Sequence, residues 1–340
     1  MKRIVPEYSF SEEQLNTISE LAMAVGLTEQ ITRILYARGM DTPEKIRYFM
    51  HPSKANFLSP FLMRGMREGV RMIEDAKRDG RCVVVFGDYD ADGVSALAIL
   101  YHALEEFGVT PRIYVPERAD GYGLSIECID RIFEECQPEL FITVDCGISC
   151  AKEAQYIYEL GADVLITDHH ELPQVLPDCT VINCKKGYPF DSLCGAGVAY
   201  KLAYAIIGEE ADKYLDLVAL ATIADSMPLI DENRDLVFEG LELIKSQRNS
   251  PINVLFSLCG AKEISSNSLA FSVAPRVNAA GRMGDANSAL KFFNCDNDEE
   301  RLNLANKMVS YNIDRQNECE AVYKEAKEQL KIKGNYDKII

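Results

Sequence analysis

The sequence has no apolar run long enough to cross a bilayer, and no apolar segment follows its first residues. We therefore expect neither a membrane-spanning protein nor a signal peptide. The 11 cysteines include no Cys-x-x-Cys pair, which argues against a zinc finger or a disulfide scaffold. Cys82, Cys146 and Cys259 lie within apolar runs, as buried free thiols do, so we expect a reducing, cytoplasmic location.

Basic residues are scarce relative to acidic ones. The chain carries 36 Lys and Arg against 53 Asp and Glu, a formal net charge of -17. Such a balance ordinarily argues against a nucleic-acid-binding protein. The excess is uneven, because residues 1–80 hold 12 basic and 11 acidic side chains while the remainder holds 24 and 42. Net charge governs solubility and long-range steering rather than what a local groove binds, so composition leaves the partner open.

The densest group of carboxylates directly follows an apolar stretch. Residues 83–86, Val-Val-Val-Phe, are typical of a buried strand of a parallel sheet. Asp88, Asp90 and Asp92 come next, between two glycines. Three like charges in so short a segment repel one another unless something neutralises them. Carboxylate oxygens are natural ligands of divalent cations, so the stretch predicts a metal site; a solvated acidic loop is the alternative.

Apolar strands and helices alternate after residue 80. This alternation indicates an α/β fold, an open parallel sheet with helices on both faces. The expected strands are 82–86, 112–116, 140–144, 163–167 and a short 181–183, and the expected helices between them are 95–107, 125–136 and 151–160. A helical lead-in comes first, with helices that begin near Ser11, Thr28 and Thr42, followed by a helix over 66–77.

The same patterns suggest an order of domains. We expect a helical N-terminal segment (1–65), an α/β domain (66–235), a helical extension that carries residues 276–282 (236–297), a long helix (298–333) and the start of a further domain (334–340). The long helix would span about 50 Å, too much for the interior of one domain. Because the last residues resemble a strand that has just begun, we expect an N-terminal fragment of a longer protein.

Metal-type ligands follow three of the expected strands. Asp145 follows the third strand and Asp168-His169-His170 the fourth, and Asp225 stands where a helix over 212–223 ends. Ligands of such sheets bind beyond the carboxyl ends of the strands. Helix N-capping explains one such residue but not all of them. Six carboxylates and two histidines exceed what one cation needs, so we infer two cations, Mn²⁺ or Mg²⁺, that share a carboxylate. Two such cations suit phosphoester hydrolysis.

These residues resemble the four motifs of the DHH phosphoesterase superfamily, and within it the RecJ single-strand-specific exonucleases. The motifs are Asp88-Tyr89-Asp90-Ala91-Asp92-Gly93, Asp145, Asp168-His169-His170 and Asp225. The similarity extends over nearly the whole chain and includes Ala37-Arg38-Gly39 and the segments 114–124 and 274–283. The Asp-His-His triplet alone would be a weak signal, but these motifs in this order and spacing are specific.

The resemblance implies two ligand sets. Asp88, Asp90 and Asp145 would surround one cation, and Asp92, Asp145, His169 and Asp225 the other, with Asp145 as the catalytic bridge. Many superfamily members have a histidine four residues before the position of Asp90, where this chain has Phe86. His170 would touch the scissile phosphate and assist the leaving oxygen as a general acid. An orienting role for His170 is the alternative.

Other residues are candidates for substrate binding. Arg118 follows a strand end and precedes a glycine-rich turn, so it is a candidate clamp for the 5′ end of DNA, or else a surface ion-pair partner. Arg276, Asn278 and Arg282 resemble the substrate-facing segment of the family. Gly195-Ala196-Gly197 precedes a helix and would either cradle a phosphate or allow tight packing, and its spacing favours packing.

The resemblance implies a metal-dependent 5′-to-3′ exonuclease that degrades single-stranded DNA to 5′-mononucleotides in recombination and repair. Partners would include a helicase and a single-strand-binding protein. The alternatives are a phosphodiesterase or phosphatase for short oligonucleotides or nucleotide messengers, and a non-catalytic replication scaffold of the same fold. A haloacid-dehalogenase-type phosphatase would match Asp90-Ala91-Asp92-Gly93 but has no use for His169 and His170.

Overall fold

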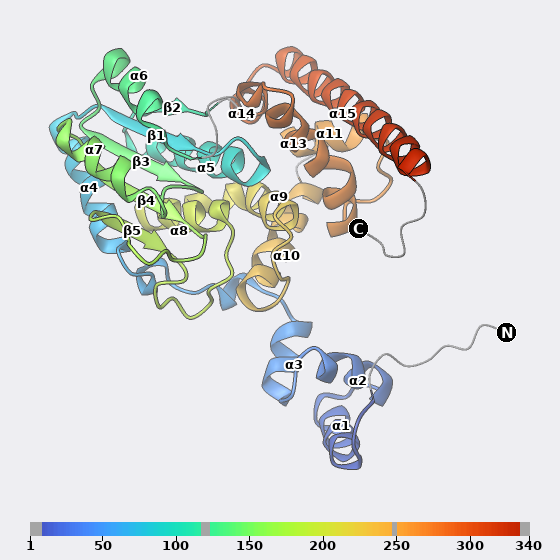
Figure 1. Ribbon diagram of the computed structural model, residues 1–340. Coiled ribbons are helices and arrows are strands. Elements are labelled where there is room, and N and C mark those ends of the chain that lie inside the picture. Colours follow the sequence, from blue (N-terminus) through green and yellow to red (C-terminus); the bar gives the residue numbers. More distant parts are fainter. Residues whose placement is uncertain (1–8, 117–122, 247–249, 334–340) are drawn as a thin grey trace. The chain divides into compact units, whose positions relative to one another are not determined.

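The chain divides into two units, Met1–Asn56 and Phe57–Ile340. The structure, a computed structural model, describes residues 9–116, 123–246 and 250–333 (Figure 1). The Leu58 backbone is bonded within the second unit, because Glu232 accepts its N–H at 2.8 Å and Lys201 donates to its carbonyl at 2.8 Å. The expected start of a further domain at 334–340 lies outside the described residues.

Three short helices form the first unit. They are α1 (Glu12–Val25), α2 (Glu29–Ala37) and α3 (Pro43–Met50), followed by the 3-10 turn η1 (Lys54–Asn56). Each helix begins at a predicted cap, because Ser11, Thr28 and Thr42 accept the backbone N–H three residues further on. The buried apolar side chains of this unit's core are Leu21, Leu35, Met40 and Ile46.

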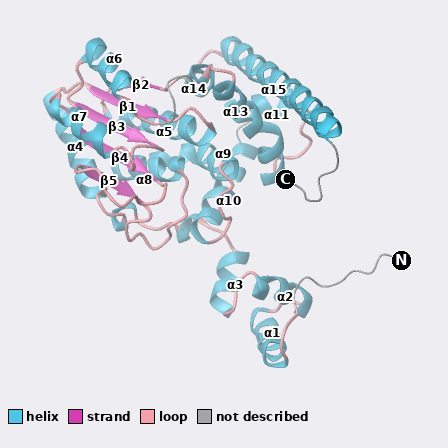
Figure 2. Ribbon diagram, viewed as in Figure 1, coloured by secondary structure: helices cyan, strands magenta, loops and turns pink. Residues whose placement is uncertain are grey.

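A parallel five-stranded sheet is the centre of the second unit. Its strands are β1 (Val83–Gly87), β2 (Arg112–Tyr114), β3 (Leu140–Val144), β4 (Asp163–Asp168) and β5 (Thr180–Asn183). The strands lie in the order β2-β1-β3-β4-β5, and every neighbouring pair is parallel. Helices flank this sheet, as Figures 1 and 2 show. The predicted fold class is confirmed.

Helices cover both faces of the sheet. They are α4 (Met66–Asp79), α5 (Ala91–Phe107) and α8 (Gly195–Ile207) on one face, and α6 (Ile126–Cys136) and α7 (Ala151–Glu159) on the other. In β1, Val83 and Val85 join the first core, whereas Val84 and Phe86 join the second. All of β1 is buried, as expected for a strand covered on both sides.

Helix α5 begins earlier than the sequence predicted. We expected it to start at Ser95, after an acidic loop, but its first residue is Ala91. The Asp90 side chain accepts the N–H groups of Asp92 and Gly93 and so acts as the N-cap. Asp92 therefore lies in the first helical turn, where its direction is set by the helix.

The rest of the second unit is helical. Its elements are η2 (Pro60–Leu62), η4 (Gly208–Tyr214), α9 (Leu215–Ala224), α10 (Asp231–Ser246), α11 (Pro251–Leu258), α12 (Ser266–Ser268), a π-helical turn (Leu269–Val273), α13 (Ala274–Arg282), α14 (Ala286–Asn294) and α15 (Asp298–Lys333). The helix expected over 212–223 starts at Leu215 because the 3-10 helix η4 precedes it. The predicted bounds of the long helix α15 are confirmed. Within the described ranges, no helix combines the length and the apolar character that crossing a membrane requires.

Candidate metal centre

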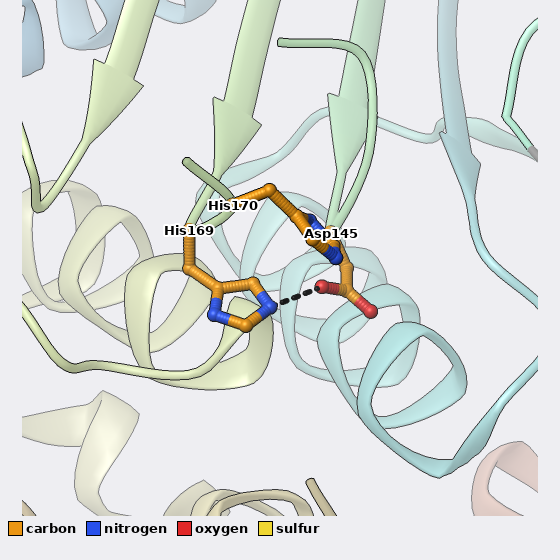
Figure 3. A group of neighbouring side chains, drawn as sticks. All are labelled: Asp145, His169 and His170. Atoms are coloured by element: carbon orange, nitrogen blue, oxygen red, sulfur yellow. Dashed lines mark ion pairs between the residues drawn. The ribbon is translucent and has the colours of Figure 1, made fainter. Parts of the chain in front are cut away.

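The strand order reverses at one point of the sheet. The connection from β1 leads outward to β2, whereas β3, β4 and β5 follow on the other side of β1. The carboxyl ends of β1 and β3 therefore flank the switch point, where open α/β sheets bind their ligands. Asp88 follows β1, Asp145 follows β3, and β4 ends in Asp168. Figure 3 shows Asp145, His169 and His170 together beyond the ends of the strands.

The structure brings all six predicted metal ligands together. They form the groups Asp88/Asp90/Asp145, Asp92/His169/Asp225 and Asp145/His169/His170, and within each group the possible ligand atoms lie within 4.8 Å of one another. Asp225 is contributed by the C-cap of α9, as the sequence predicted. Asp145 belongs to two of the groups. This is the arrangement that two neighbouring cations with a shared carboxylate would need.

Asp145 is the buried centre of this arrangement. Its side chain is almost fully enclosed, and its Oδ1 atom has no hydrogen-bond partner among the described residues. The Nε2 atom of His169 lies 3.2 Å from that oxygen. Burial, reinforced by Asp92 and other carboxylates, raises the pKa of Asp145 well above its usual value. A buried carboxylate oxygen without a donor is costly unless a cation pairs with it, so the donor set fits a divalent metal.

Asp92 is held by the N-terminus of α8. Its two carboxylate oxygens accept the N–H groups of Gly195 and Ala196, each at 2.7 Å. The helix terminus favours the negative charge. A Cβ atom at Gly195 would lie 2.3 Å from Oδ1 of Asp145, so only glycine fits there. The glycine-rich start of α8 therefore holds one candidate ligand and allows the close approach of another, which agrees with the packing alternative of the sequence analysis.

Asp88 and Asp90 are two further carboxylates near Asp92 and Asp145. Asp88 is buried, and its Oδ1 accepts the N–H of Tyr89 at 2.8 Å. Burial, followed by the charge of Asp90, raises the pKa values of Asp88 and Asp92 to about 7. The carboxylates therefore repel one another in the absence of a cation, which is the electrostatic situation that the sequence predicted.

The two adjacent histidines have opposite environments. His169 is buried, and burial lowers its pKa to about 4, so at neutral pH it is an uncharged imidazole, the form that binds metals. His170 keeps 45% of its side chain exposed, and its hydrogen bond to Asp168 raises its pKa. When the pKa values of two neighbouring groups are shifted in opposite directions, the groups typically have different roles. Here His169 is suited to bind metal and His170 to act as an acid.

Asp168 was one of the six carboxylates counted in the sequence, but it was assigned to neither ligand set. Its Oδ1 lies 2.7 Å from Nδ1 of His170, and its Oδ2 accepts the N–H of Ile148 at 2.9 Å. Burial by itself would raise the pKa of Asp168, but hydrogen bonds from His170 and Ile148 outweigh it and lower the pKa. An ionised Asp168 fixes the ring of His170. Its place in the triplet was visible in the sequence, but the direction of its side chain was not.

Comparisons with known proteins show the family to which this chain belongs. Residues 82–222 match the family model described as "DHH family, N-terminal domain". A crystal structure of exonuclease RecJ bound to manganese is 34% identical, with a TM-score of 0.75, over 80% of this chain and 72% of that chain. This chain belongs to the RecJ family of DHH-domain proteins.

Two further RecJ proteins show how much of the family's length is present. RecJ of Thermus thermophilus in complex with Mn²⁺ is 30% identical, with a TM-score of 0.78, over 92% of this chain and 46% of that chain. The single-stranded-DNA-specific exonuclease RecJ of Bacillus subtilis is 37% identical over 93% of this chain and 41% of its own length. The chain thus spans less than half the length of these two relatives.

This RecJ-family chain departs from the superfamily pattern at Phe86. The Phe86 ring is fully buried in the core shared with α6 and α7, where its centroid lies 6.3 Å from that of Phe141. It therefore fills core volume and offers no ligand. Asp88, two residues further on, instead completes the group with Asp90 and Asp145.

Besides His170, four substrate residues were predicted, and the structure places three of them. Arg276 donates to the carbonyl of Phe271 at 3.1 Å, and Asn278 accepts the N–H of Ala91 at 2.8 Å. Arg282 lines a cavity of about 330 Å³ beside the end of α9, together with Arg315, which the sequence analysis did not single out. Arg118 lies outside the described residues.

Proposed function

We propose that this RecJ-family chain carries the catalytic part of a metal-dependent exonuclease that hydrolyses single-stranded DNA in the 5′-to-3′ direction and releases 5′-mononucleotides. The observation that carries the proposal is the position of Asp145 in two ligand groups at the switch point of the sheet. Similarity to a manganese-bound exonuclease RecJ supports it. Because the chain spans 41% of its Bacillus subtilis relative, the activity of the whole protein is part of the proposal.

The residues fit two divalent cations, Mn²⁺ in the first place and Mg²⁺ as the alternative. Asp88, Asp90 and Asp145 would hold one cation, and Asp92, Asp145, His169 and Asp225 would hold the other. Mixed carboxylate and imidazole ligands suit Mn²⁺ better than Mg²⁺, which binds histidine less readily. When bound, the cations would supply Lewis-acid activation of water and stabilise the charge that develops on a displaced phosphoryl group.

The chain itself contributes a proton donor and an environment for the strand. His170 is half exposed and has a raised pKa, so it is suited to assist the leaving oxygen as a general acid. Asp168 orients its ring. Arg282 and Arg315 line the cavity next to Ser226, one residue beyond Asp225, where guanidinium groups suit the phosphates of a bound strand. Arg118 and Arg276 complete the proposed contacts with DNA.

The proposed setting is recombination and DNA repair in the cytoplasm. A helicase that separates duplex DNA and a protein that binds single strands would supply the substrate. These partners follow from the resemblance to RecJ and from the chemistry of a single-stranded substrate.

A time course on labelled single strands tests the proposal. One strand carries a 5′ label and the other a 3′ label, and each is incubated with Mn²⁺, with Mg²⁺ or with a chelator. We expect immediate release of a mononucleotide from the 5′ label, slow shortening of the 3′-labelled strand, and no product with chelator or with Asp145→Ala.

Two other outcomes would contradict it. Cleavage of a trinucleotide without cleavage of long strands would assign the site to short oligonucleotides. No cleavage of either substrate, despite metal bound in calorimetry, would indicate a scaffold protein.

A further inference from the structure

Helix α13 lies against the turn that carries the first metal ligands. This turn, residues 88–91, joins β1 to α5 and includes Asp88 and Asp90. The carboxamide Oδ1 of Asn278 accepts the N–H of Ala91 at 2.8 Å, a contact between residues 187 positions apart. Asn278 thus contacts the backbone directly beside a candidate ligand.

Gly281, about one helical turn further along α13, brings the two backbones into direct contact. A Cβ atom at this position would lie 2.3 Å from the carbonyl oxygen of Tyr89. Distances below 3.0 Å force a shift of the neighbour, and here the neighbour is backbone. Ala279, Ala280 and Gly281 are all buried, so small side chains allow α13 to approach the turn.

The turn requires such a partner because it begins a helix. The first N–H groups of α5 have no acceptor within the helix. Oδ1 of Asp90 accepts the N–H groups of Asp92 and Gly93, at 2.9 and 3.0 Å. Asn278 accepts the remaining N–H of this turn, that of Ala91. The Asp90 carboxylate therefore need not turn toward Ala91, which leaves its second oxygen, Oδ2, available to a cation.

The position of α13 is itself determined by neighbouring helices. Helix α13 packs against α14 and α15, and the π-helical turn Leu269–Val273 leads directly into it. π-Helical turns inside helices are frequent at functional sites, because the extra residue changes which side chains face a neighbour. Here the residues after the π turn face the ligand-bearing turn.

We propose that Asn278 and Gly281 are positioning residues for the cation held by Asp88, Asp90 and Asp145. Asn278 keeps Asp90 directed at the cation, and Gly281 keeps the 88–91 backbone in place. This inference rests on the proposed metal centre, but it gives Asn278 a role other than the substrate contact that the resemblance implied.

Calorimetric titration with Mn²⁺ in the absence of DNA tests this role. The variants are Asn278→Ala, which removes the acceptor, and Asn278→Asp, which retains it in the same place. We expect Asn278→Ala to weaken one of the two Mn²⁺ equivalents about tenfold, the effect of one hydrogen bond, and to leave the other within about threefold. Asn278→Asp should bind both equivalents at least as tightly as the unaltered protein, because it keeps the acceptor and its added negative charge favours a nearby cation.

Two controls make the result specific. Asn306→Ala, at an exposed position of α15, removes an asparagine remote from the turn and should change neither equivalent. Gly281→Ala should weaken the same equivalent as Asn278→Ala, and circular dichroism shows whether each variant is folded. If Asn278→Ala folds poorly, the comparison of Asn278→Asp with Asn278→Ser, whose shorter side chain does not reach the Ala91 N–H, carries the test.

Unchanged Mn²⁺ binding by Asn278→Ala, with a raised KM for single-stranded DNA, would overturn the proposal and assign Asn278 to the substrate. Loss of one Mn²⁺ equivalent in a protein that cleaves no DNA would support the positioning role while contradicting the proposed exonuclease. The experiment can therefore contradict the positioning role of Asn278 and the proposed exonuclease activity independently of each other.

Discussion

The Nε2 atom of His169 lies 3.2 Å from Oδ1 of Asp145, although the two residues come from the ends of different strands. The pair is buried, His169 is uncharged at neutral pH, and Asp145 has no other partner for this oxygen among the described residues. A neutral imidazole and an unpaired carboxylate oxygen are the groups that a cation would join. The centre is therefore arranged for metal and is electrostatically unfavourable without it.

The raised pKa values of two neighbouring aspartates predict how the stability of the protein depends on pH. The pKa values of Asp88 and Asp92 are about 7 in the folded, metal-free protein, whereas an aspartate of an unfolded chain has a pKa near 3.9. The folded state thus binds more protons between about pH 4 and 7. Their contribution to stability is complete below about pH 4 and is lost as the pH rises through about 7.

Thermal unfolding with chelator and with excess Mn²⁺ measures this effect. We expect the rise in Tm caused by Mn²⁺ to be larger at about pH 8 than at about pH 5.5, because Mn²⁺ competes with protons for the same oxygens. Asp88→Asn should reduce the difference, while Asp163→Asn, at the other end of β4, should not. An equal rise in Tm at both pH values would contradict the prediction.

Asp168→Asn tests the orientation of His170. An amide at this position keeps the shape but removes the charge that raises the pKa of His170. We expect the alkaline side of the pH–rate profile to move to lower pH and kcat on single-stranded DNA to fall about tenfold to a hundredfold. Glu171→Gln, a neighbouring exposed carboxylate, is the matched control and should leave the profile in place. A profile of Asp168→Asn that stays unchanged would remove His170 from proton transfer.

Gly195 and Gly197 lie in the first turn of α8 and differ in how much space a side chain would have. A Cβ atom at Gly195 would lie 2.3 Å from Oδ1 of Asp145, whereas one at Gly197 would make ordinary contact at 3.4 Å with Leu193. We expect Gly195→Ala to cost about 1–3 kcal/mol of unfolding free energy and to abolish tight Mn²⁺ binding. Gly197→Ala should be neutral or stabilising by up to about 1 kcal/mol, since alanine favours the helix. Denaturant unfolding and calorimetry measure both, and equal effects of the two variants would disprove the steric argument.

A buried ion pair fixes the beginning of the second unit. Lys201 and Glu232 are 2% and 0% exposed and paired at 2.5 Å, and Tyr188 donates to the same carboxylate at 2.8 Å. Burial lowers the pKa of Lys201, while Glu232 opposes that shift. Removing one partner leaves an unpaired buried charge, so Lys201→Met should cost about 3–5 kcal/mol of unfolding free energy.

Lys213→Met is the matched control for this pair. Lys213 and Glu106 form a partly exposed pair, and breaking it should cost less than about 1 kcal/mol. The double variant Lys201→Met/Glu232→Gln should be more stable than Lys201→Met alone, because no charge is left unpaired. Urea unfolding gives all three values, and a double variant less stable than the single one would rule out the charge argument.

Local patterns in the sequence were enough to predict the sheet and the set of candidate ligands. Strand and helix periods are local, and parallel strands place all their carboxyl ends at one edge, so the grouping of Asp88, Asp145 and His169 followed without knowledge of side-chain positions. Helix starts were less certain. The start of α5 was misplaced at Ser95 because the pattern did not show that the Asp90 side chain would bond to the following N–H groups.

The groups that support those ligands became visible only in the folded protein. Asp92 meets the start of α8 across 103 residues, and Asn278 meets Ala91 across 187. Lys201 and Glu232 likewise find each other only through folding. No local period encodes such pairs, because they depend on how whole helices pack. The local sequence thus determines which residue types serve as candidate ligands, whereas the contacts that hold them in place depend on the packing of the core.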